Sequence, residues 1–147
     1  MRAVIQRVSQ AEVVINNVSY SKINKGILVL IAFSNGDSYE TVKWMSNKIV
    51  NLRIFPDEQD KMNRSVLDSH GEIMIISNFT LYGDVKKGFR PNFMNSAAPE
   101  IAEPMYEEFV SYLKAIYPLK VVSGEFRAMM DIKLVNSGPV TVIIDKD

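Results

Sequence analysis

Val135-Asn136-Ser137-Gly138-Pro139-Val140-Thr141, near the C-terminus, is the most informative stretch of this chain for its fold. It joins two runs that are typical of strands, residues 131–135 and 140–145. A Gly-Pro step between strands is typical of a hairpin turn. An X-Pro bond also adopts the cis form at modest cost, and a cis bond makes a sharp, rigid corner. Because glycine has no Cβ, a ligand can approach its backbone closely. We therefore expect a cis Gly138–Pro139 bond between two strands.

A second segment, Ser77-Asn78-Phe79-Thr80-Leu81, follows a strand-like run at residues 72–77. Together the two segments resemble the D-aminoacyl-tRNA deacylase family, which carries Ser-Gln-x-Thr-Leu and, further along, Asn-x-Gly-Pro-x-Thr. Two positions depart from that pattern: Asn78 stands where the family usually has Gln, and Arg127 where it usually has Gly. Shorter matches run in order along the whole chain, at residues 1–8, 51–55, 61–63, 87–88, 90–91 and 97–99.

The composition describes an ordinary globular protein. The chain has 147 residues, of which 47% are hydrophobic and 23% charged, and we expect one domain spanning residues 1–147. No apolar run approaches a membrane span, and the N-terminus lacks a signal-peptide pattern. Cysteine is absent, which excludes a thiol nucleophile and fits a cytoplasmic protein. The formal net charge is zero, so any contact with nucleic acid must be local.

The chain has a single histidine, His70. A zinc site of the His/Cys type is therefore excluded within one chain, and a Ser-His-Asp triad could use only this residue. His70 precedes Gly71 between two strand-like runs, which favours a solvated turn. We expect neither a metal nor a cofactor.

The remaining pattern predicts a mixed α/β domain with two main helices. Further strand-like runs lie at residues 3–8, 11–15, 18–21, 27–33 and 120–123. Asp37 and Glu40 resemble a capping box that begins the first helix. The second helix is predicted from apolar residues at helical spacing, and residues 82–98 form a long polar loop. Its apolar stripe would consist of Ile101, Met105, Phe109, Tyr112 and Ile116. The family resemblance implies a three-layer α/β/β domain with mixed sheets that works as a homodimer.

The resemblance also implies a reaction. The substrate would be a D-amino acid esterified to the 3′-terminal adenosine of tRNA, and the ester would be hydrolysed. Ser77, Asn78, Phe79 and Thr80 would form the catalytic segment, with the backbone of Phe79 and Thr80 facing the scissile carbonyl. Backbone N–H groups can stabilise an oxyanion without any titratable side chain. Thr80 is an alternative nucleophile, but no base that could activate it is evident.

Chiral selection is assigned in this family to the Gly-Pro step, here Gly138-Pro139. The step would enter the pocket of the partner subunit and crowd the place of an L side chain, so selection would need the dimer. Arg7 is expected to brace it, although a surface strand arginine is the alternative for that residue.

Three basic residues and one aromatic residue complete the expected site. Phe126 would stack on the terminal adenine, or it belongs to the core. Lys86, Lys87 and Arg90 would meet phosphates near the acceptor end of tRNA, or they form a solvated basic loop. A rival function is a related domain that binds aminoacyl-tRNA or a free D-amino acid without hydrolysis. Asn78 and Arg127 motivate this rival, since either change could alter the site.

Overall fold

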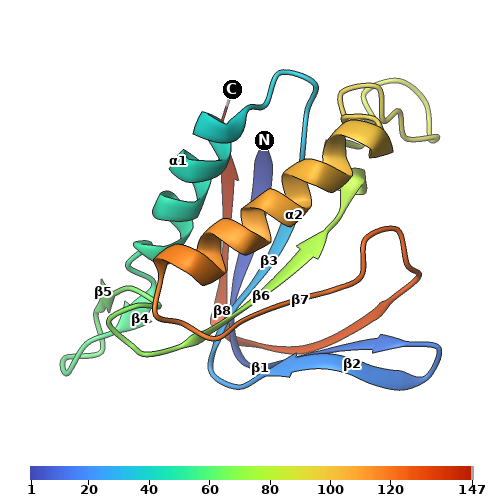
Figure 1. Cartoon of the computed structure of the whole chain (residues 1–147). Helices are drawn as coiled ribbons and strands as arrows, with labels where there is room; N and C mark the ends of the chain where they lie inside the picture. The colour runs from blue at the N-terminus through green and yellow to red at the C-terminus, as the bar shows by residue number, and fades with distance from the viewer. Residues whose placement is uncertain (147) are drawn as a thin grey trace.

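The computed structural model describes residues 1–146, and it places two helices on one side of a strongly curved sheet (Figure 1). The helices are α1 (Tyr39–Val50) and α2 (Pro99–Ile116), and a short 3₁₀ helix, η1, spans Phe79–Tyr82. The strands are β1 (Arg2–Ile15), β2 (Val18–Ile23), β3 (Gly26–Ala32), β4 (Phe55–Pro56), β5 (Met62–Arg64), β6 (Glu72–Ser77), β7 (Val121–Ser123) and β8 (Asp131–Asp145).

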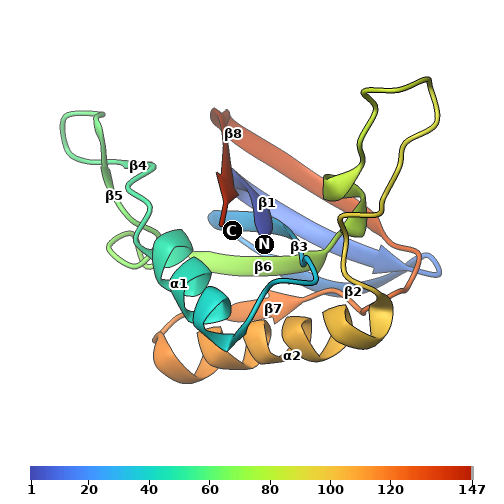
Figure 2. The same cartoon turned by 90° about the horizontal axis from the view of Figure 1, so that it is seen from above.

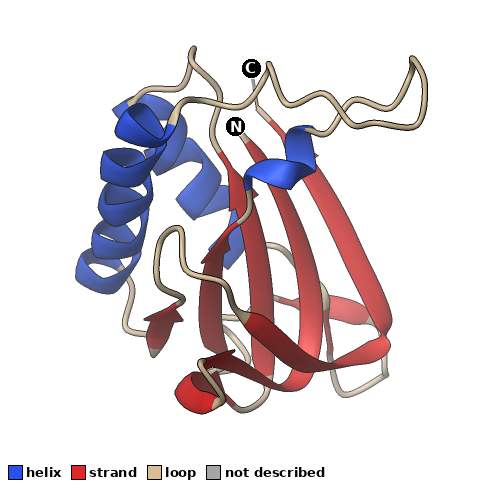
Figure 3. Ribbon diagram, turned by 90° about the vertical axis from the view of Figure 1, so that its right-hand side faces the viewer, coloured by secondary structure: helices blue, strands red, loops and turns tan. Residues whose placement is uncertain are grey.

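The long strand β1 organises the sheet. One of its edges pairs first with β3, along residues 2–8, and then with β2, along residues 11–15; its other edge pairs with β8. The strand order is β2-β1-β3-β6-β7, with β3, β6 and β7 mutually parallel and the other pairs antiparallel. Figure 3 shows the long strands side by side, curling over at their lower ends. The sheet therefore folds back over itself.

The curvature produces two cores and hence three layers. On one face of β3 and β6, side chains such as Ile27, Val29 and Ile75 are buried against the helices. On the other face, Leu28 and Met74 pack with residues of β1 and β2 in a second buried cluster. Seen from above, the helices lie on one side of β6 and the strands β1 and β8 on the other (Figure 2). The predicted three-layer α/β/β arrangement with mixed strands and two main helices is thus confirmed.

Two strand boundaries were predicted wrongly, because strands expected as pairs are continuous. Residues 3–8 and 11–15 belong to the single strand β1, and residues 131–135 and 140–145 belong to the single strand β8. The ladder pairs Gln6 with Thr141 and Val8 with Asn136, so four residues of β8 lie opposite Arg7 alone. Gly138–Pro139 therefore sits in a bulge within a strand, since both flanks of the step pair with the same partner strand.

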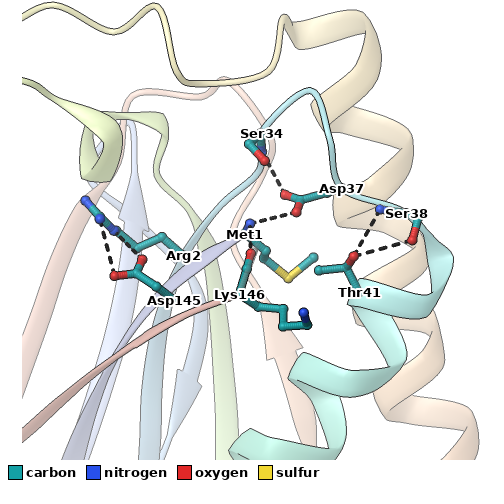
Figure 4. A network of polar contacts seen from close by, with 8 residues as sticks. All are labelled: Met1, Arg2, Ser34, Asp37, Ser38, Thr41, Asp145 and Lys146. Atoms are coloured by element: carbon teal, nitrogen blue, oxygen red, sulfur yellow. Dashed lines mark hydrogen bonds and ion pairs between the residues drawn. The ribbon is translucent and has the colours of Figure 1, made fainter.

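The first helix begins one residue later than the capping prediction. Ser38 is the N-cap of α1, and its backbone N–H donates to Thr41 Oγ1 at 3.3 Å. Asp37 instead holds the N-terminus, since its carboxylate accepts from the Met1 amino group and from Ser34 N–H, both at 2.7 Å (Figure 4). The Met1 amino group also donates to Lys146 O at 2.7 Å, which joins the first strand of the sheet to the last.

The second helix is rotated relative to the predicted stripe. Ile101 and Ile116 are exposed, whereas the buried residues are Ala102, Tyr106, Phe109, Val110 and Leu113. The prediction failed because apolar residues also occupy the flank of this helix, and spacing alone does not say which stripe meets the sheet. Neither α1 nor α2 is long and apolar enough to cross a membrane.

Candidate functional site

A cavity of about 780 Å³ opens where the parallel strands β3 and β6 end. The N-terminal end of α2 and the segment between β7 and β8 complete its walls. The carboxyl ends of parallel strands are where open α/β sheets bind ligands. Among the lining residues are Ser77, Asn78, Phe79, Thr80, Phe126 and Arg127. The fold therefore brings the whole predicted catalytic segment and the predicted adenine platform into one cavity.

The predicted catalytic segment, residues 77–80, is a tight turn held by Asn78. The Asn78 backbone N–H donates to Ile31 O at 2.8 Å, which fixes the turn to the end of β3. Its side-chain oxygen accepts from the backbone N–H of Thr80 at 3.2 Å and from the Thr80 hydroxyl at 2.5 Å. An asparagine that binds the backbone two residues on closes an Asx turn. Asn78, the first departure from the family pattern, thus determines how Thr80 is presented.

Two chemical consequences follow from this turn. Thr80 N–H already donates to the Asn78 side chain. Phe79 N–H is the backbone donor of this turn that has no acceptor among residues 1–146. The Thr80 hydroxyl points its proton at an amide oxygen, which cannot take up a proton, and its lone pairs stay available. A nucleophilic threonine needs a base within hydrogen-bonding reach, and this geometry provides none.

Phe126 lies between the cavity and the core. Its ring lines the cavity and packs against the buried Tyr106, with ring centroids 5.8 Å apart. The Tyr106 hydroxyl lies 2.9 Å from Ile75 O and 3.2 Å from Gly124 O, and burial raises the pKa of this tyrosine to about 12. Phe126 therefore packs against the core and also lines the cavity, and its stacking on the terminal adenine stays a prediction.

Sequence reasoning missed Tyr106. It supports Phe126 from behind and links α2 to the ends of β6 and β7. Its spacing from the buried residues Ala102 and Phe109 was the available signal, but the stripe chosen for the second helix excluded it.

The bulge around Gly138–Pro139 lies away from the cavity. The Gly138–Pro139 bond is cis, which confirms that prediction, and both residues are exposed. Arg7 Nε donates to Ser137 O at 3.1 Å and Arg7 Nη1 to Ile54 O at 2.7 Å, so Arg7 does brace the bulge. Arg7 of β1 pairs with Ile27 of β3, and Ser77 of β6 pairs with Ile31, four residues further along β3. Strand spacings place the two motifs roughly 20 Å apart along the sheet.

The predicted basic residues lie on the long loop. Lys86, Lys87 and Arg90 are exposed, and none of them lines the cavity. The base of the loop is closed by paired backbone bonds between Asp84 and Asn92, while Phe93 contributes to the cavity and packs edge-on against Phe79. The loop, in yellow-green, projects beyond the body of the domain (Figure 1).

The titratable groups of residues 1–146 offer little acid–base chemistry at the cavity. His70 lies in a turn with a φ of 48° and does not line the cavity, which confirms its predicted setting. Within the described part of the chain, no group of three or more His, Cys, Asp or Glu side chains is placed to hold a metal ion.

Comparison with known proteins gives one consistent result. Residues 4–145 match the family model described as D-Tyr-tRNA(Tyr) deacylase. The chain is 53% identical to the D-aminoacyl-tRNA deacylase of Petrotoga mobilis and 52% identical to that of Thermosipho africanus; each match covers 99% of this chain and 97% of the relative. A solved structure of a c-Myc DNA unwinding element binding protein superposes with a TM-score of 0.95 at 38% identity, covering 100% of this chain and 99% of that one.

Proposed function

The chain belongs to the D-Tyr-tRNA(Tyr) deacylase family, and we propose that it hydrolyses the ester bond of D-aminoacyl-tRNA, releasing free tRNA and a D-amino acid. The observation that carries the proposal is the cavity at the end of β6. It combines a free backbone donor at Phe79, an oriented hydroxyl at Thr80 and an aromatic surface at Phe126.

The chemistry asks little of the side chains. An ester is already activated, so the main requirements are an oriented water and a donor for the developing oxyanion. Phe79 N–H supplies the donor. The Thr80 hydroxyl, whose proton is held by Asn78, accepts a hydrogen bond from the attacking water and orients it. The ribose 2′-hydroxyl of the substrate assists, and no metal or cofactor takes part.

The aminoacylated 3′ end of tRNA is the proposed partner. The terminal adenine stacks on Phe126, because an aromatic ring suits a single unpaired base. Lys86, Lys87 and Arg90 meet backbone phosphates further from the ester. Their exposure on a projecting loop supports contact with an extended ligand. We propose the cytoplasm as the location of this activity, because the proposed substrate is aminoacylated tRNA.

Selection against L-amino acids is assigned to Gly138–Pro139 of a second copy of the chain. The bulge is exposed and braced by Arg7, and it lies roughly 20 Å from the cavity of its own chain by strand spacings. In the proposed homodimer, the bulge of each subunit enters the cavity of the other subunit, so the distance within one chain does not prevent contact. The bulge then crowds the position of an L side chain and leaves the D side chain free.

The test is single-turnover deacylation of D-Tyr-tRNA and L-Tyr-tRNA by the same preparation. We expect release of D-tyrosine and retention of the L ester, unchanged after treatment with a chelator. Binding of D-Tyr-tRNA without release would instead establish the non-hydrolysing rival. Restoration of activity by zinc after chelation would contradict the mechanism.

A further inference from the structure

Arg127 occupies a backbone conformation that its residue type disfavours. Its φ is 64°, in the left-handed region. The other non-glycine residues with positive φ are Asn16, Asn17, Asp60 and His70, all of types that tolerate this region. Arg127 is the exception among residues 1–146, because its long side chain gains no local hydrogen bond from the strained backbone. A strained residue at a site is a reason to look for function there.

The strain arises from a fixed turn. Ala128 N–H donates to Glu125 O at 3.3 Å, so Arg127 is the third residue of a four-residue turn. With φ positive at that position alone, the turn has type II geometry, which favours glycine there. Gly124 N–H donates to Ile75 O at 3.0 Å, and Phe126 packs on Tyr106. The turn is thus anchored to β6 and α2, and it holds Arg127 at the wall of the cavity.

The guanidinium has no partner within the described chain. Four other arginines have acceptors there: Arg2 binds Asp145, Arg7 binds Ser137 O and Ile54 O, Arg53 binds Asn63, and Arg64 binds Glu58. No hydrogen bond or ion pair joins Arg127 to any residue of 1–146. It is exposed and lines a mainly apolar cavity beside the half-buried Phe126.

We infer that Arg127 binds the 5′-phosphate of the nucleotide whose base stacks on Phe126. A guanidinium next to an aromatic platform suits an anion attached to a stacked base, because its planar fork binds phosphate through two hydrogen bonds. The inference rests on the proposed function and adds a specificity-determining contact to it. Arg127 would bind the phosphate nearest the reacting ester, whereas the basic side chains of the long loop lie outside the cavity.

The decisive experiment varies one phosphate. The probes are 3′-O-D-alanyl-adenosine, the same compound with a 5′-phosphate, and D-alanyl-tRNA. We expect the wild-type chain to show about tenfold higher kcat/KM for the phosphorylated compound, the gain that one charge-assisted contact supplies. Arg127→Gly and Arg127→Asn should abolish that difference between the two compounds. Both variants suit positive φ, so they fold. Arg127→Lys should keep part of the gain.

The matched control is Lys114→Gln, which removes the same charge near the far end of α2, roughly 18 Å along the helix from Ala102. It should preserve the preference for phosphate. On D-alanyl-tRNA, Arg127→Asn should reduce the slope of log kcat/KM against log salt by about 0.7, and Lys114→Gln should not.

Other outcomes separate this inference from the proposed function. Equal wild-type rates on the two small compounds, with an unchanged salt slope for Arg127→Asn, would overturn the inference alone. Faster cleavage of both compounds by Arg127→Gly would mean that Arg127 obstructs the platform. If no ester is cleaved, the proposed function fails, and NMR titration with AMP and adenosine decides the inference: tighter binding of AMP, lost in Arg127→Asn, would support it, and equal binding would refute it.

Discussion

The turn after β6 and the bulge in β8 carry the two motifs that mark this chain, but their surroundings differ. The turn is completed by its own chain: Asn78 orients Thr80, Ile31 O fixes the turn to β3, and Tyr106 supports the adjoining strand end. The bulge is braced by Arg7, yet Gly138 and Pro139 face outward. Hydrolysis needs groups held rigidly around the ester. Selection, as proposed here, needs a group from a second copy of the chain that occupies the position of an L side chain. We infer that catalysis and selection are built on separate ends of the sheet.

The largest expected effect contrasts D- and L-alanyl-tRNA. If the bulge excludes the L side chain, D-alanyl-tRNA should react at least 1000-fold faster, since a rigid clash readily supplies about 4 kcal/mol. Glycyl-tRNA has no side chain to exclude and should be hydrolysed measurably. Side-by-side deacylation of the three esters measures both ratios. Comparable rates for the L and D esters would mean that the bulge has no part in selection.

The next effect concerns the turn. Thr80→Ala should lower kcat for D-alanyl-tRNA by roughly 10- to 100-fold, because it removes a water-orienting hydroxyl and not a nucleophile. Thr80→Ser keeps the hydroxyl and should be close to wild type. The D-to-L ratio should stay constant in both variants.

A loss near a millionfold in Thr80→Ala, or a trapped acyl-enzyme on Thr80, would show that the hydroxyl attacks the ester directly. Such a result would contradict the geometry in which Asn78 holds the hydroxyl proton.

Arg7→Ala addresses the bulge. Loss of the contacts to Ser137 O and Ile54 O should loosen the bulge and reduce the D-to-L ratio about tenfold. The rate for glycyl-tRNA should change little, since the turn after β6 is untouched. Arg7→Lys retains one charge-assisted bond and serves as the matched control. If the glycyl rate falls as far as the ratio, the two ends of the sheet are not separate.

The smallest effect is a change in stability. Tyr106→Phe removes the hydroxyl that supports the β6 end and should lower the free energy of unfolding at pH 7 by about 1 kcal/mol. The pKa of Tyr106 is raised to about 12 in the folded chain. The wild-type protein should therefore lose stability as pH rises from about 10 to 12, because only the unfolded state then loses its proton.

Urea unfolding of both proteins at pH 7 and pH 11 measures the difference. Wild type should approach the variant at the higher pH, while other tyrosines affect both alike. A gap that widens with pH would contradict the buried position of the hydroxyl.

Motif spacing predicted the participants of the site better than their arrangement. Ser77 to Thr80 and Phe126 do share a cavity, and Arg7 does contact the Gly138–Pro139 bulge. The expectation of two separate strands around Gly138 was wrong, because local residue preferences cannot reveal that both flanks pair with one long strand. Tyr106 was missed because two apolar stripes on α2 are equivalent until the sheet selects one.

The residue chemistry could be read from the order of amino acids alone: no thiol, one histidine, zero net charge, and two motifs whose pattern resembles one family. Those properties depend on residue type and local order, which are complete in the chain. Which groups meet became clear only in the folded chain: the Asn78 side-chain oxygen accepts a hydrogen bond from the Thr80 hydroxyl, Arg127 is strained and unpaired within residues 1–146, and Gly138 lies far from Ser77. These facts depend on contacts between distant segments, which hydrogen bonding and burial select only when the whole sheet forms.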